Sequence, residues 1–232
     1  MPVAIITGAS KGLGRALARA LAGRGWDLVL DARTASVLKE TADGLDGHGG
    51  RVVPLAGDVT DAAHRRALVA AAEGLGGLDL LVHNASALGA EPLVPLAEQP
   101  LEGFRAALET NAVAALGLVQ ESLALLRRAE AGAVVAVSSD AAAEAYATWG
   151  GYGASKAALD HLAAVLAVEE PGLRVWAVDP GDMRTDLYRA AVPGDEDARP
   201  EPETVVPGFL RLLDRRPASG RYAAPALVRE AR

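Results

Sequence analysis

Short apolar runs alternate along the chain with longer stretches in which apolar residues recur at helical spacing. The short runs are rich in Val, Leu and Ile and are bounded by Gly, Pro, Asp or Asn, which is typical of strands buried in a parallel sheet. We predict strands at Val3–Thr7, Asp27–Asp31, Arg51–Ala56, Leu78–His83, Ala133–Ser138 and Leu173–Val178, and a short last strand at Tyr222–Ala224.

The longer stretches are amphipathic and predict helices between these strands. Alternating strands and helices predict a doubly wound parallel α/β sheet with helices on both faces, which gives three layers. The chain has no linker, repeat or low-complexity tract, so we expect residues 1–232 to form a single domain. The acidic, proline-rich stretch Pro193–Pro202 predicts an exposed loop. The predicted helices are Leu13–Arg24, Ser36–Leu45, Asp61–Gly74, Leu101–Arg128, Tyr152–Val168 and a last one near Glu203–Leu213.

Composition narrows the class of protein. Half of the 232 residues are apolar and 23% are charged, which favours a large buried core. No uncharged apolar run reaches about 18 residues, so we expect no membrane-spanning helix, and Met1–Ile6 lacks the features of a signal peptide. The absence of cysteine excludes disulfides, thiolate metal ligands and a cysteine nucleophile. The net charge of −7 argues against nucleic-acid binding. We therefore expect no nucleic-acid partner. From the composition as a whole we expect a cytoplasmic protein with neither a metal site nor a membrane partner.

A glycine-rich turn, Thr7-Gly8-Ala9-Ser10-Lys11-Gly12-Leu13-Gly14, follows the first predicted strand and opens the first helix. Free N–H groups and the helix dipole favour an anion there, and glycines allow a pyrophosphate to approach the backbone. The spacing is Gly-x-x-x-Gly-x-Gly instead of the usual Gly-x-Gly-x-x-Gly. A tight turn that needs positive φ would also explain the glycines, but the position between strand and helix favours a cofactor.

This turn resembles the one that opens the compact short-chain dehydrogenases/reductases, and further matches in the family's order extend the resemblance over roughly residues 3–185. The resemblance implies a Rossmann-like fold and a nicotinamide cofactor. The cofactor contacts that it assigns in this turn are Gly8, Ser10, Lys11, Gly12, Leu13 and Gly14.

The end of the second strand bears on the choice between NAD and NADP. A carboxylate there binds the ribose hydroxyls of NAD, whereas an arginine pairs with the 2′-phosphate of NADP. The family's NAD-selecting acid lies eighteen residues after Gly14, which here is Ala32; Asp31 is one residue earlier and should point to the opposite face. Arg33 and Lys11 occupy positions where NADP-preferring members carry basic residues. We therefore expect NADP(H); the alternative is that both cations are solvated and the enzyme is NAD-linked.

Two more strand ends match the family. In Gly57-Asp58-Val59 the family's Asp binds the adenine amino group, although a helix N-cap would also explain Asp58. In His83-Asn84-Ala85-Ser86, where the family usually has Asn-Asn-Ala-Gly, two residues match and the backbone borders the cofactor ribose. His83 and Ser86 depart from the pattern, either as harmless replacements or because Ser86 shapes the substrate entrance. The cofactor contacts assigned here are Asp58, Val59, Asn84 and Ala85.

Four residues match the family's catalytic set. The spacing Tyr-x-x-x-Lys places Tyr152 and Lys156 on one face of a helix, about one turn apart. Ser139 precedes Tyr152 by thirteen residues, the separation typical of the family, and Asn111 lies in Thr110-Asn111-Ala112. Each match is common by itself, but the four follow the glycine turn in the family's order and with its spacing.

The resemblance implies roles that carbonyl chemistry requires. Hydride attack on a carbonyl leaves charge on the oxygen, which must be protonated, and a free phenol with a pKa near 10 suits neutral pH poorly. We expect the ammonium group of Lys156 and the positive nicotinamide to lower the pKa of Tyr152, which would act as acid in reduction and base in oxidation. Lys156 would also bind the nicotinamide ribose, Ser139 the substrate oxygen, and Asn111 a water that links Lys156 to solvent.

The segment Asp179–Thr185 also matches the family, which has Pro-Gly here and a threonine four residues after the glycine. The resemblance implies that the segment covers the nicotinamide and that Thr185 binds its carboxamide, so that hydride is transferred on the pro-S face at C4. The cofactor contacts assigned here are Pro180, Gly181, Met183 and Thr185, together with Tyr152 and Lys156.

The substrate is expected above the nicotinamide, at the carboxyl ends of the strands. Trp149 and Tyr146 suggest an apolar or aromatic carbonyl compound, unless both are core or interface residues. A ketone or aldehyde is favoured over an enoyl thioester, because family enoyl reductases space the tyrosine and lysine more widely. The pocket residues that we predict are Ser86, Tyr146, Trp149 and Tyr188, with Leu88, Asp140, Met183 and Leu187 as further walls.

The predicted helices Leu101–Arg128 and Tyr152–Val168 are rich in Ala, Leu and Val. In the family the corresponding pair packs against a second subunit, which implies a homodimer or homotetramer; the alternative is that these faces only cover the sheet. A protein that senses NADP(H) without turnover is the main alternative function, although such proteins usually lose the tyrosine or the lysine. Sugar-nucleotide epimerases are longer and space the glycine turn differently.

Overall fold

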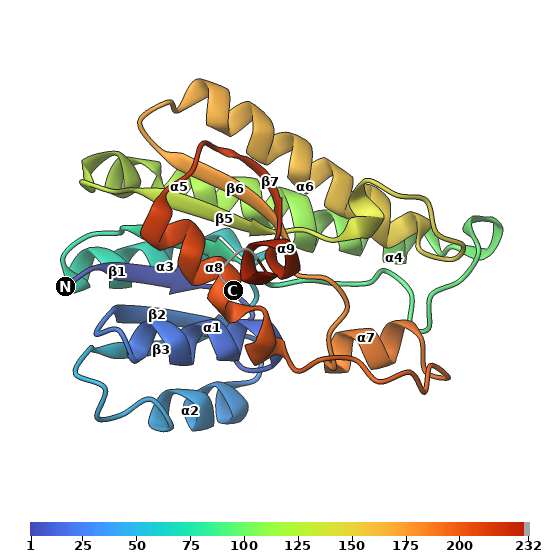
Figure 1. The fold of residues 1–232 in the computed structure, drawn as a ribbon, viewed down its shortest axis with the longest axis horizontal. Coiled ribbons are helices and arrows are strands. Elements are labelled where there is room, and N and C mark those ends of the chain that lie inside the picture. The colour runs from blue at the N-terminus through green and yellow to red at the C-terminus, as the bar shows by residue number, and fades with distance from the viewer. Residues whose placement is uncertain (230–232) are drawn as a thin grey trace.

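A computed structural model describes residues 1–229 of the chain. Its centre is a parallel sheet with the strand order β3-β2-β1-β4-β5-β6-β7 (Figure 1). The chain moves outward from β1 to β3 and returns to the other side of β1 with β4, so a switch point lies between β1 and β4. Ligands of such sheets bind at the carboxyl ends of the strands beside that point. The strands are β1 Val3–Ile6, β2 Asp27–Ala32, β3 Val52–Ala56, β4 Leu80–His83, β5 Ala133–Val137, β6 Arg174–Asp179 and β7 Gly220–Ala223.

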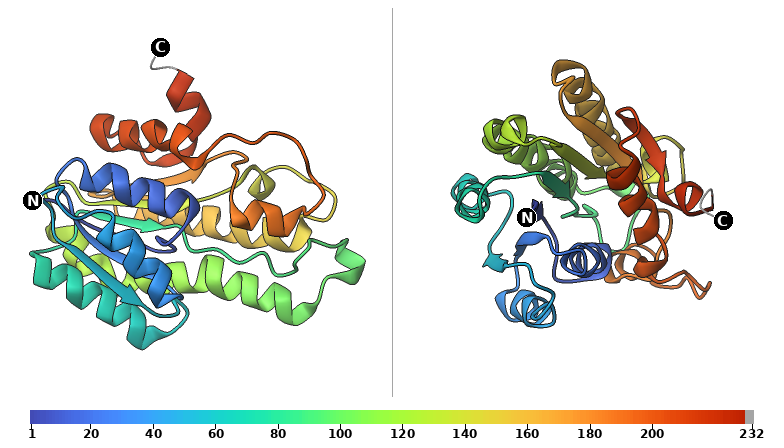
Figure 2. Two further views of the ribbon diagram at one scale, coloured as in Figure 1. Left: turned by 90° about the horizontal axis from the view of Figure 1, so that it is seen from below. Right: turned by 60° about the vertical axis from the view of Figure 1, so that its left-hand side comes forward.

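Helices cover both faces of the sheet (Figure 2). Helices α1, α2 and α8 pack on one face, and α3, α5 and α6 pack on the other. This arrangement confirms the predicted doubly wound sheet of three layers. The helices are α1 Gly12–Ala22, α2 Ala35–Asp43, α3 Ala62–Leu75, α4 Leu101–Leu108, α5 Ala114–Arg128, α6 Gly150–Glu169, α7 Asp186–Ala191, α8 Val206–Arg215 and α9 Ala224–Arg229, with short 3₁₀ turns at Leu96–Glu98, Asp140–Ala142 and Pro202–Thr204.

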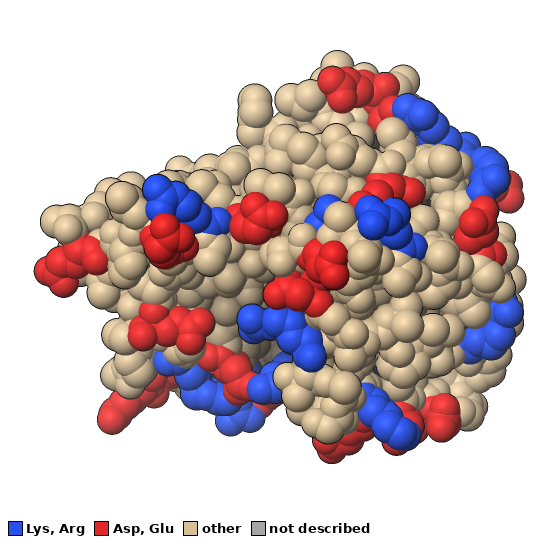
Figure 3. All heavy atoms as spheres, turned by 180° about the vertical axis from the view of Figure 1, so that it is seen from behind, with Lys and Arg blue, Asp and Glu red and all other residues tan. Residues whose placement is uncertain are grey.

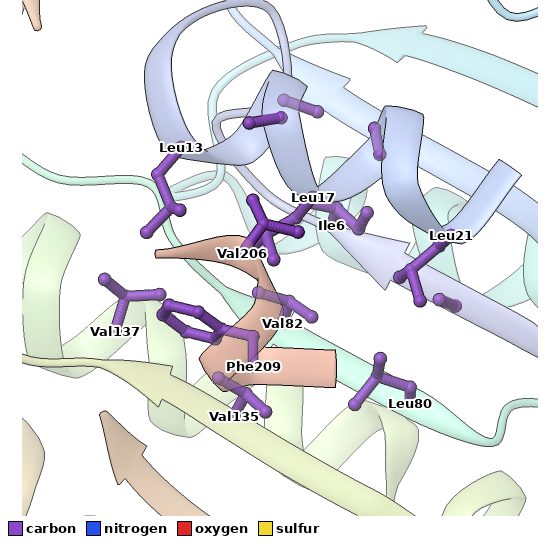
Figure 4. Packing of buried hydrophobic residues seen from close by; sticks show 14 of the residues in the cluster. Ile6, Leu13, Leu17, Leu21, Leu80, Val82, Val135, Val137, Val206 and Phe209 are labelled. Carbon is purple, nitrogen blue, oxygen red and sulfur yellow. The ribbon is translucent and has the colours of Figure 1, made fainter. Parts of the chain in front are cut away.

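The core beneath α1 shows how local spacing attaches a helix to the sheet (Figure 4). Leu13, Leu17 and Leu21 recur every four residues, so they lie on one face of α1, and none is more than 4% exposed. Val206 and Phe209 of α8 are three residues apart and join the same cluster. Full burial of one such side chain contributes about 1.5–3 kcal/mol, so these side chains fix both helices on the strands.

The predicted helical segment Leu101–Arg128 has the predicted ends, but it contains a π-helical turn that the sequence prediction did not include. After α4 a π-helical turn spans Glu109–Val113, and α5 begins only at Ala114. The turn contains Asn111, whose side chain is fully buried and hydrogen-bonds outside the helix. Such turns are rare and occur frequently at functional sites.

Two short helices near the end of the chain are missing from the sequence prediction. Helix α7 begins directly after Thr185, whose side-chain oxygen accepts a hydrogen bond from the backbone N–H of Tyr188 and so caps the helix. Helix α9 follows β7 without an intervening loop. Between α7 and the turn at Pro202–Thr204 the chain is irregular and mostly exposed, as predicted for Pro193–Pro202.

Acidic and basic side chains are interspersed over the face seen in Figure 3, without a continuous basic surface there. Within residues 1–229, no helix is both long and apolar enough to cross a bilayer. In the same residues, no three His, Cys, Asp or Glu side chains are grouped so that they could hold a metal ion. The cytoplasmic location stays a prediction.

Candidate active site

A cleft of about 610 Å³ lies at the carboxyl ends of the strands and extends from β2 and β3 past the switch point to α7. It joins segments that are far apart in the sequence, among them the glycine turn, the carboxyl ends of β2 and β3 and the segment after β6. Most predicted site residues line it: Gly8, Ser10, Lys11, Gly12, Leu13, Arg33, Asp58, Val59, Asn84, Ala85, Ser86, Leu88, Ser139, Asp140, Trp149, Tyr152, Lys156, Pro180, Gly181, Met183, Thr185, Leu187 and Tyr188.

The glycine turn has the geometry of an anion site. No side chain caps the N-terminus of α1, and its first turn contains no acidic residue, so its N–H groups and dipole are available to an anion. Gly8 has a φ of +63°, which favours glycine. Gly14 does not line the cleft; it packs beneath the turn, where an added Cβ would lie 2.3 Å from the carbonyl oxygen of Gly8. Glycine is therefore required there for packing.

Thr7 is a site residue that the sequence prediction overlooked. Its side chain is fully buried, and Oγ1 accepts hydrogen bonds from the backbone N–H groups of Asn84 and Ala85, both at 3.0 Å. In return, Nδ2 of Asn84 donates to the carbonyl oxygens of Thr7 and Gly8 at 3.0 and 3.1 Å. The glycine turn and the end of β4 are thus held together across the switch point. The signal in the sequence is a hydroxyl residue directly before Gly8.

The end of β2 has the predicted register. Asp31 points to the α3 side, where its Oδ1 lies 2.7 Å from Nε2 of His64, so the expectation that it faces away from Ala32 is confirmed. Ala32 and the exposed Arg33 line the cleft. No carboxylate therefore occupies the position at which the family selects NAD.

Asp58 does not cap α3, which removes the alternative interpretation of this residue. The cap is Asp61, whose Oδ1 accepts from the N–H of Ala63 at 2.8 Å. The Asp58 carboxylate instead accepts from the N–H and hydroxyl groups of Thr60 at 2.9 and 2.8 Å. These hydrogen bonds lower the pKa of Asp58, although burial of the carboxyl group has the opposite effect. It is therefore held as a carboxylate at the rim of the cleft.

Lys11 makes a contact that the sequence prediction did not include. Its ammonium nitrogen lies 3.0 Å from Oδ2 of Asp186, the first residue of α7, and both side chains are more than half exposed. The glycine turn is therefore linked to the segment that starts α7. The predicted contact of Lys11 with a 2′-phosphate would compete with this carboxylate.

Tyr152 and Lys156 lie one turn apart on α6 and are 6% and 1% exposed. Nζ of Lys156 donates to the carbonyl oxygen of Val137 at 2.8 Å and lies 5.7 Å from the centre of the Tyr152 ring. Burial raises the pKa of Tyr152 to about 12, with the facing Ser86 hydroxyl opposing that effect. Burial also lowers the pKa of Lys156 to about 8. Desolvation thus dominates both groups in the protein alone, and the lowering of the Tyr152 pKa that we expect from Lys156 together with the nicotinamide stays a prediction.

Ser139 lies between β5 and the turn at Asp140–Ala142. Its hydroxyl donates to Oδ1 of Asp140 at 3.1 Å and accepts from the N–H of Ala141 at 3.2 Å. Oδ1 of Asp140 also accepts from that N–H at 2.7 Å, which fixes the carboxylate beside the hydroxyl. The serine hydroxyl is therefore oriented by the turn that it begins.

Asn111 does not line the cleft. Its Nδ2 donates to the carbonyl oxygen of Ala87 at 2.9 Å and to Oγ of Ser155 at 2.8 Å, and its Oδ1 accepts from the N–H of Ala87 at 2.8 Å. The side chain thus connects the loop after β4 to α6, between the two residues of the Tyr-x-x-x-Lys motif. The relay water that we predicted beside Lys156 stays a prediction, and the observed side-chain contacts position the loop instead.

Aromatic side chains form one wall of the cleft beyond Tyr152. The Trp149 ring contacts Tyr152 edge-on, with centroids 5.7 Å apart, and lies 6.4 Å from the Tyr188 ring. Tyr188 is held in turn by Asp195 and by Arg199, whose guanidinium group covers its ring at 5.2 Å. This wall suits an apolar or aromatic substrate group.

Tyr146 does not belong to this wall, which corrects the prediction. Its side chain is 43% exposed, and its hydroxyl lies 3.1 Å from Asp140 and 3.0 Å from Glu144. These two carboxylates hold the phenol at the surface, outside the cleft lining. Ser86 does line the cleft, whereas the neighbouring His83 is 2% exposed. Burial lowers the pKa of His83 to about 3, so it is a neutral core residue.

Carboxylates are the main charged groups in the half of the cleft where we expect the substrate. Asp140, Asp179 and Asp182 all line it there. Burial raises the pKa of Asp179 and of Asp182, and each of the two is also raised by the charge of Asp140. Among residues 1–229, the basic residues that line the cleft are Lys11, Arg33 and Lys156. All three belong to the predicted cofactor contacts. An anionic substrate would therefore meet like charge.

The segment after β6 closes the cleft over the glycine turn. Gly181 has a φ of +69° and donates its N–H to Oδ1 of Asp179 at 2.9 Å. An added Cβ at Gly12 would lie 3.3 Å from Cγ2 of Thr185, so the two segments are in close contact. The predicted nicotinamide segment and the predicted pyrophosphate turn thus face one another.

Comparison with known proteins gives consistent matches. A family model described as short chain dehydrogenase matches residues 2–196. The cis-4-hydroxycyclohexanecarboxylate dehydrogenase of Sinomonas cyclohexanicum is 36% identical over 233 residues, covering 99% of this chain and 86% of that protein. A solved short chain dehydrogenase from Shigella flexneri, complexed with NADP, gives a TM-score of 0.89 at 28% identity over 97% of each chain. An alcohol dehydrogenase from Thermococcus sibiricus, complexed with 5-hydroxy-NADP, gives 0.85 at 29% identity over 96% of this chain and 95% of that one.

Proposed function

The chain belongs to the short-chain dehydrogenase/reductase family, and from this premise we propose that it is an NADP(H)-dependent carbonyl reductase. It transfers a hydride between the nicotinamide and a ketone or aldehyde, and in reverse it oxidises a secondary alcohol. The observation that carries the proposal is that Ser139, Tyr152 and Lys156 line the same cleft as the glycine turn.

The residues present fit a dinucleotide. The uncapped N-terminus of α1 and the glycine turn would hold the pyrophosphate, and Asp58 would bind the adenine. Arg33 in the cleft, with Ala32 before it, favours a 2′-phosphate. That two similar solved structures contain NADP or 5-hydroxy-NADP supports the same choice. When bound, the nicotinamide supplies or accepts the hydride.

The chain's own residues handle the proton and the developing charge. With a pKa near 12, Tyr152 is protonated at neutral pH and can donate its proton to the carbonyl oxygen during reduction. The hydroxyl of Ser139, oriented by the turn that follows, hydrogen-bonds that oxygen. Lys156, with a pKa near 8, is mostly charged at neutral pH and binds the nicotinamide ribose beside Tyr152.

The substrate that we propose is a neutral carbonyl compound with an apolar or aromatic group. Trp149 and Tyr188 supply the apolar wall, while Asp140 and Asp182 oppose a negative charge. The relative from Sinomonas cyclohexanicum acts, by its name, on a carboxylate. The acidic lining of this cleft argues against the same substrate here.

We also propose a homodimer or homotetramer. Apolar side chains are exposed along the helices that the family uses for assembly: Leu101 is 67% exposed, Val113 51%, Leu116 40%, Val165 40% and Val168 81%. Singly exposed apolar residues are ordinary, but several on adjacent helices favour an interface. Light scattering coupled to gel filtration tests the proposal.

The decisive experiment measures cofactor oxidation by the purified protein, with NADPH and NADH in parallel, over a panel of ketones and aldehydes. Oxidation that requires a carbonyl compound and is faster with NADPH supports the proposed function. Faster turnover with NADH would assign the NAD-linked alternative. Tight NADPH binding without turnover on any carbonyl would favour the sensor.

A further inference from the structure

A buried acid–base pair lies at the adenosine end of the cleft, and the proposed reaction does not use it. Asp31, near the end of β2, has a side chain that is only 3% exposed, and His64, in the first turn of α3, has one that is 10% exposed. Oδ1 of Asp31 and Nε2 of His64 are 2.7 Å apart. A carboxylate that is taken out of water is stabilised only when it is paired and hydrogen-bonded.

The pair contacts three of the segments that would surround the cofactor. The Asp31 carboxylate accepts a hydrogen bond from the backbone N–H of Gly8. The backbone carbonyl oxygen of Asp31 accepts another from the N–H of Ala9 at 2.8 Å. The His64 ring packs against the turn after β3, because a Cβ at Gly57 would lie 2.3 Å from Nδ1. The glycine turn, the end of β2 and the turn after β3, which contains Gly57 and Asp58, therefore meet at this pair.

The charge of Asp31 conflicts with a 2′-phosphate. Asp31 lines the same cleft as Arg33, and a free carboxylate near the ribose repels a phosphate while it binds ribose hydroxyls. The other charged groups that interact with the pair are Asp58, which raises the pKa of Asp31, and Arg33, which acts on Asp58. His64 hydrogen-bonds to the Asp31 carboxylate directly, whereas Arg33 acts on it only through Asp58.

We propose that His64 determines the cofactor specificity by holding the Asp31 side chain in a buried hydrogen bond. The hydrogen bond keeps the carboxyl group directed toward α3 and away from the ribose, so that a cleft with an acid on β2 accepts a 2′-phosphate. His64 is a positioning residue, since it acts through Asp31 and lies behind the cleft lining. The inference rests on the proposed preference for NADP(H).

The test measures dissociation constants of NADPH and NADH for the full chain by nucleotide fluorescence, without substrate. His64→Gln exchanges the rigid ring, which packs between Gly57 and Asp31, for a flexible side chain that no longer fixes the carboxyl group. We expect this variant to bind NADPH about tenfold more weakly and NADH almost unchanged, because a released carboxylate repels the phosphate alone. Adding Asp31→Asn to His64→Gln should restore NADPH binding, which a purely structural role would not do. His161→Gln, at an exposed histidine of α6, is the matched control.

Three outcomes overturn the inference. The first is an equal loss of both nucleotides in His64→Gln, and the second is no loss of either. The third is a double variant that binds NADPH no better than His64→Gln. If His64→Gln does not fold, Asp31→Asn alone decides, since it must leave NADPH binding intact or tighter, and weaker binding contradicts the inference.

The same data separate this inference from the proposed function. Wild-type protein that prefers NADH contradicts the proposed cofactor, while the change in the NADPH to NADH ratio between variants still tests the pair. Wild-type protein that binds neither nucleotide overturns both.

Discussion

Nζ of Lys156 lies 5.7 Å from the centre of the Tyr152 ring, one turn away on α6, and donates to the carbonyl oxygen of Val137 at 2.8 Å. Both groups are almost completely buried, so desolvation dominates each of them. It favours the neutral phenol and the neutral amine, so it raises the pKa of Tyr152 to about 12, lowers the pKa of Lys156 to about 8 and thereby moves the two values apart. The protein alone therefore keeps Tyr152 as a proton donor.

Tyr152→Phe should remove turnover while cofactor binding persists. The substitution keeps the ring that packs against Trp149 and removes only the hydroxyl, so the expected loss in kcat is that of a general acid, about 100- to 10,000-fold. Steady-state rates and NADPH titration, measured on the same preparation, check both halves. Near-normal activity in this variant would sink the assignment of Tyr152 as the acid.

The two reaction directions should respond oppositely to pH. Reduction needs the protonated phenol, which is present at neutral pH and is lost only as the pH approaches the raised pKa of Tyr152, near 12. Oxidation of an alcohol needs the phenolate, so its rate should increase with pH, and a positively charged cofactor shifts this rise to lower pH. Initial rates in both directions from pH 6 upward check this. An oxidation rate that falls as the pH rises would contradict it.

Arg33→Ala should weaken NADPH binding by about 1–3 kcal/mol, the range of a charge-assisted hydrogen bond. NADH binding should barely change, because the missing partner is the 2′-phosphate. Calorimetric titration of both nucleotides measures the difference, and Arg66→Ala, at an exposed arginine of α3, serves as the control. An equal loss for both nucleotides would mean that Arg33 does not meet the 2′-phosphate.

A matched pair of ketones should show how the carboxylates that line the cleft affect the choice of substrate. Methyl 4-acetylbenzoate and 4-acetylbenzoate share an aromatic ring for the wall formed by Trp149 and Tyr188, but only the second carries a charge. We expect kcat/KM to favour the ester by about tenfold or more, and Asp182→Asn to narrow the gap by weakening the repulsion. Equal kcat/KM values for the two ketones would show that these carboxylates do not face the substrate.

Thr7→Val should reduce stability and cofactor affinity together. The substitution keeps the shape but leaves the buried N–H groups of Asn84 and Ala85 without their acceptor, which costs about 1–3 kcal/mol per group. Urea unfolding gives the stability change. Thr204→Val is the control, because the hydroxyl of this exposed residue bonds to Glu201 and water can replace it. Equal, small losses for both variants would contradict the role given to Thr7.

The strands and most helices were predictable because their signals are local. Apolar periodicity and flanking Gly, Pro and Asp place each predicted strand within two residues of its observed ends. Helix α7 also has a local signal, Thr185-Asp186 before Leu187, but it is only six residues long. The π turn around Asn111 has no such signal, because it depends on hydrogen bonds to Ala87 and Ser155, which lie 24 and 44 residues away.

The fold class, the position of the glycine turn and the facing of Asp31 away from Ala32 follow from the sequence alone. Each of these follows from the periodicity of one element or from the spacing within one motif. The tertiary structure alone decided that Asp31 pairs with His64, that Lys11 pairs with Asp186, that Tyr146 lies outside the cleft and that the pKa of Tyr152 is raised. Pairing and desolvation depend on groups that only folding brings together, so ionisation and specificity at this site are properties of the assembled cleft.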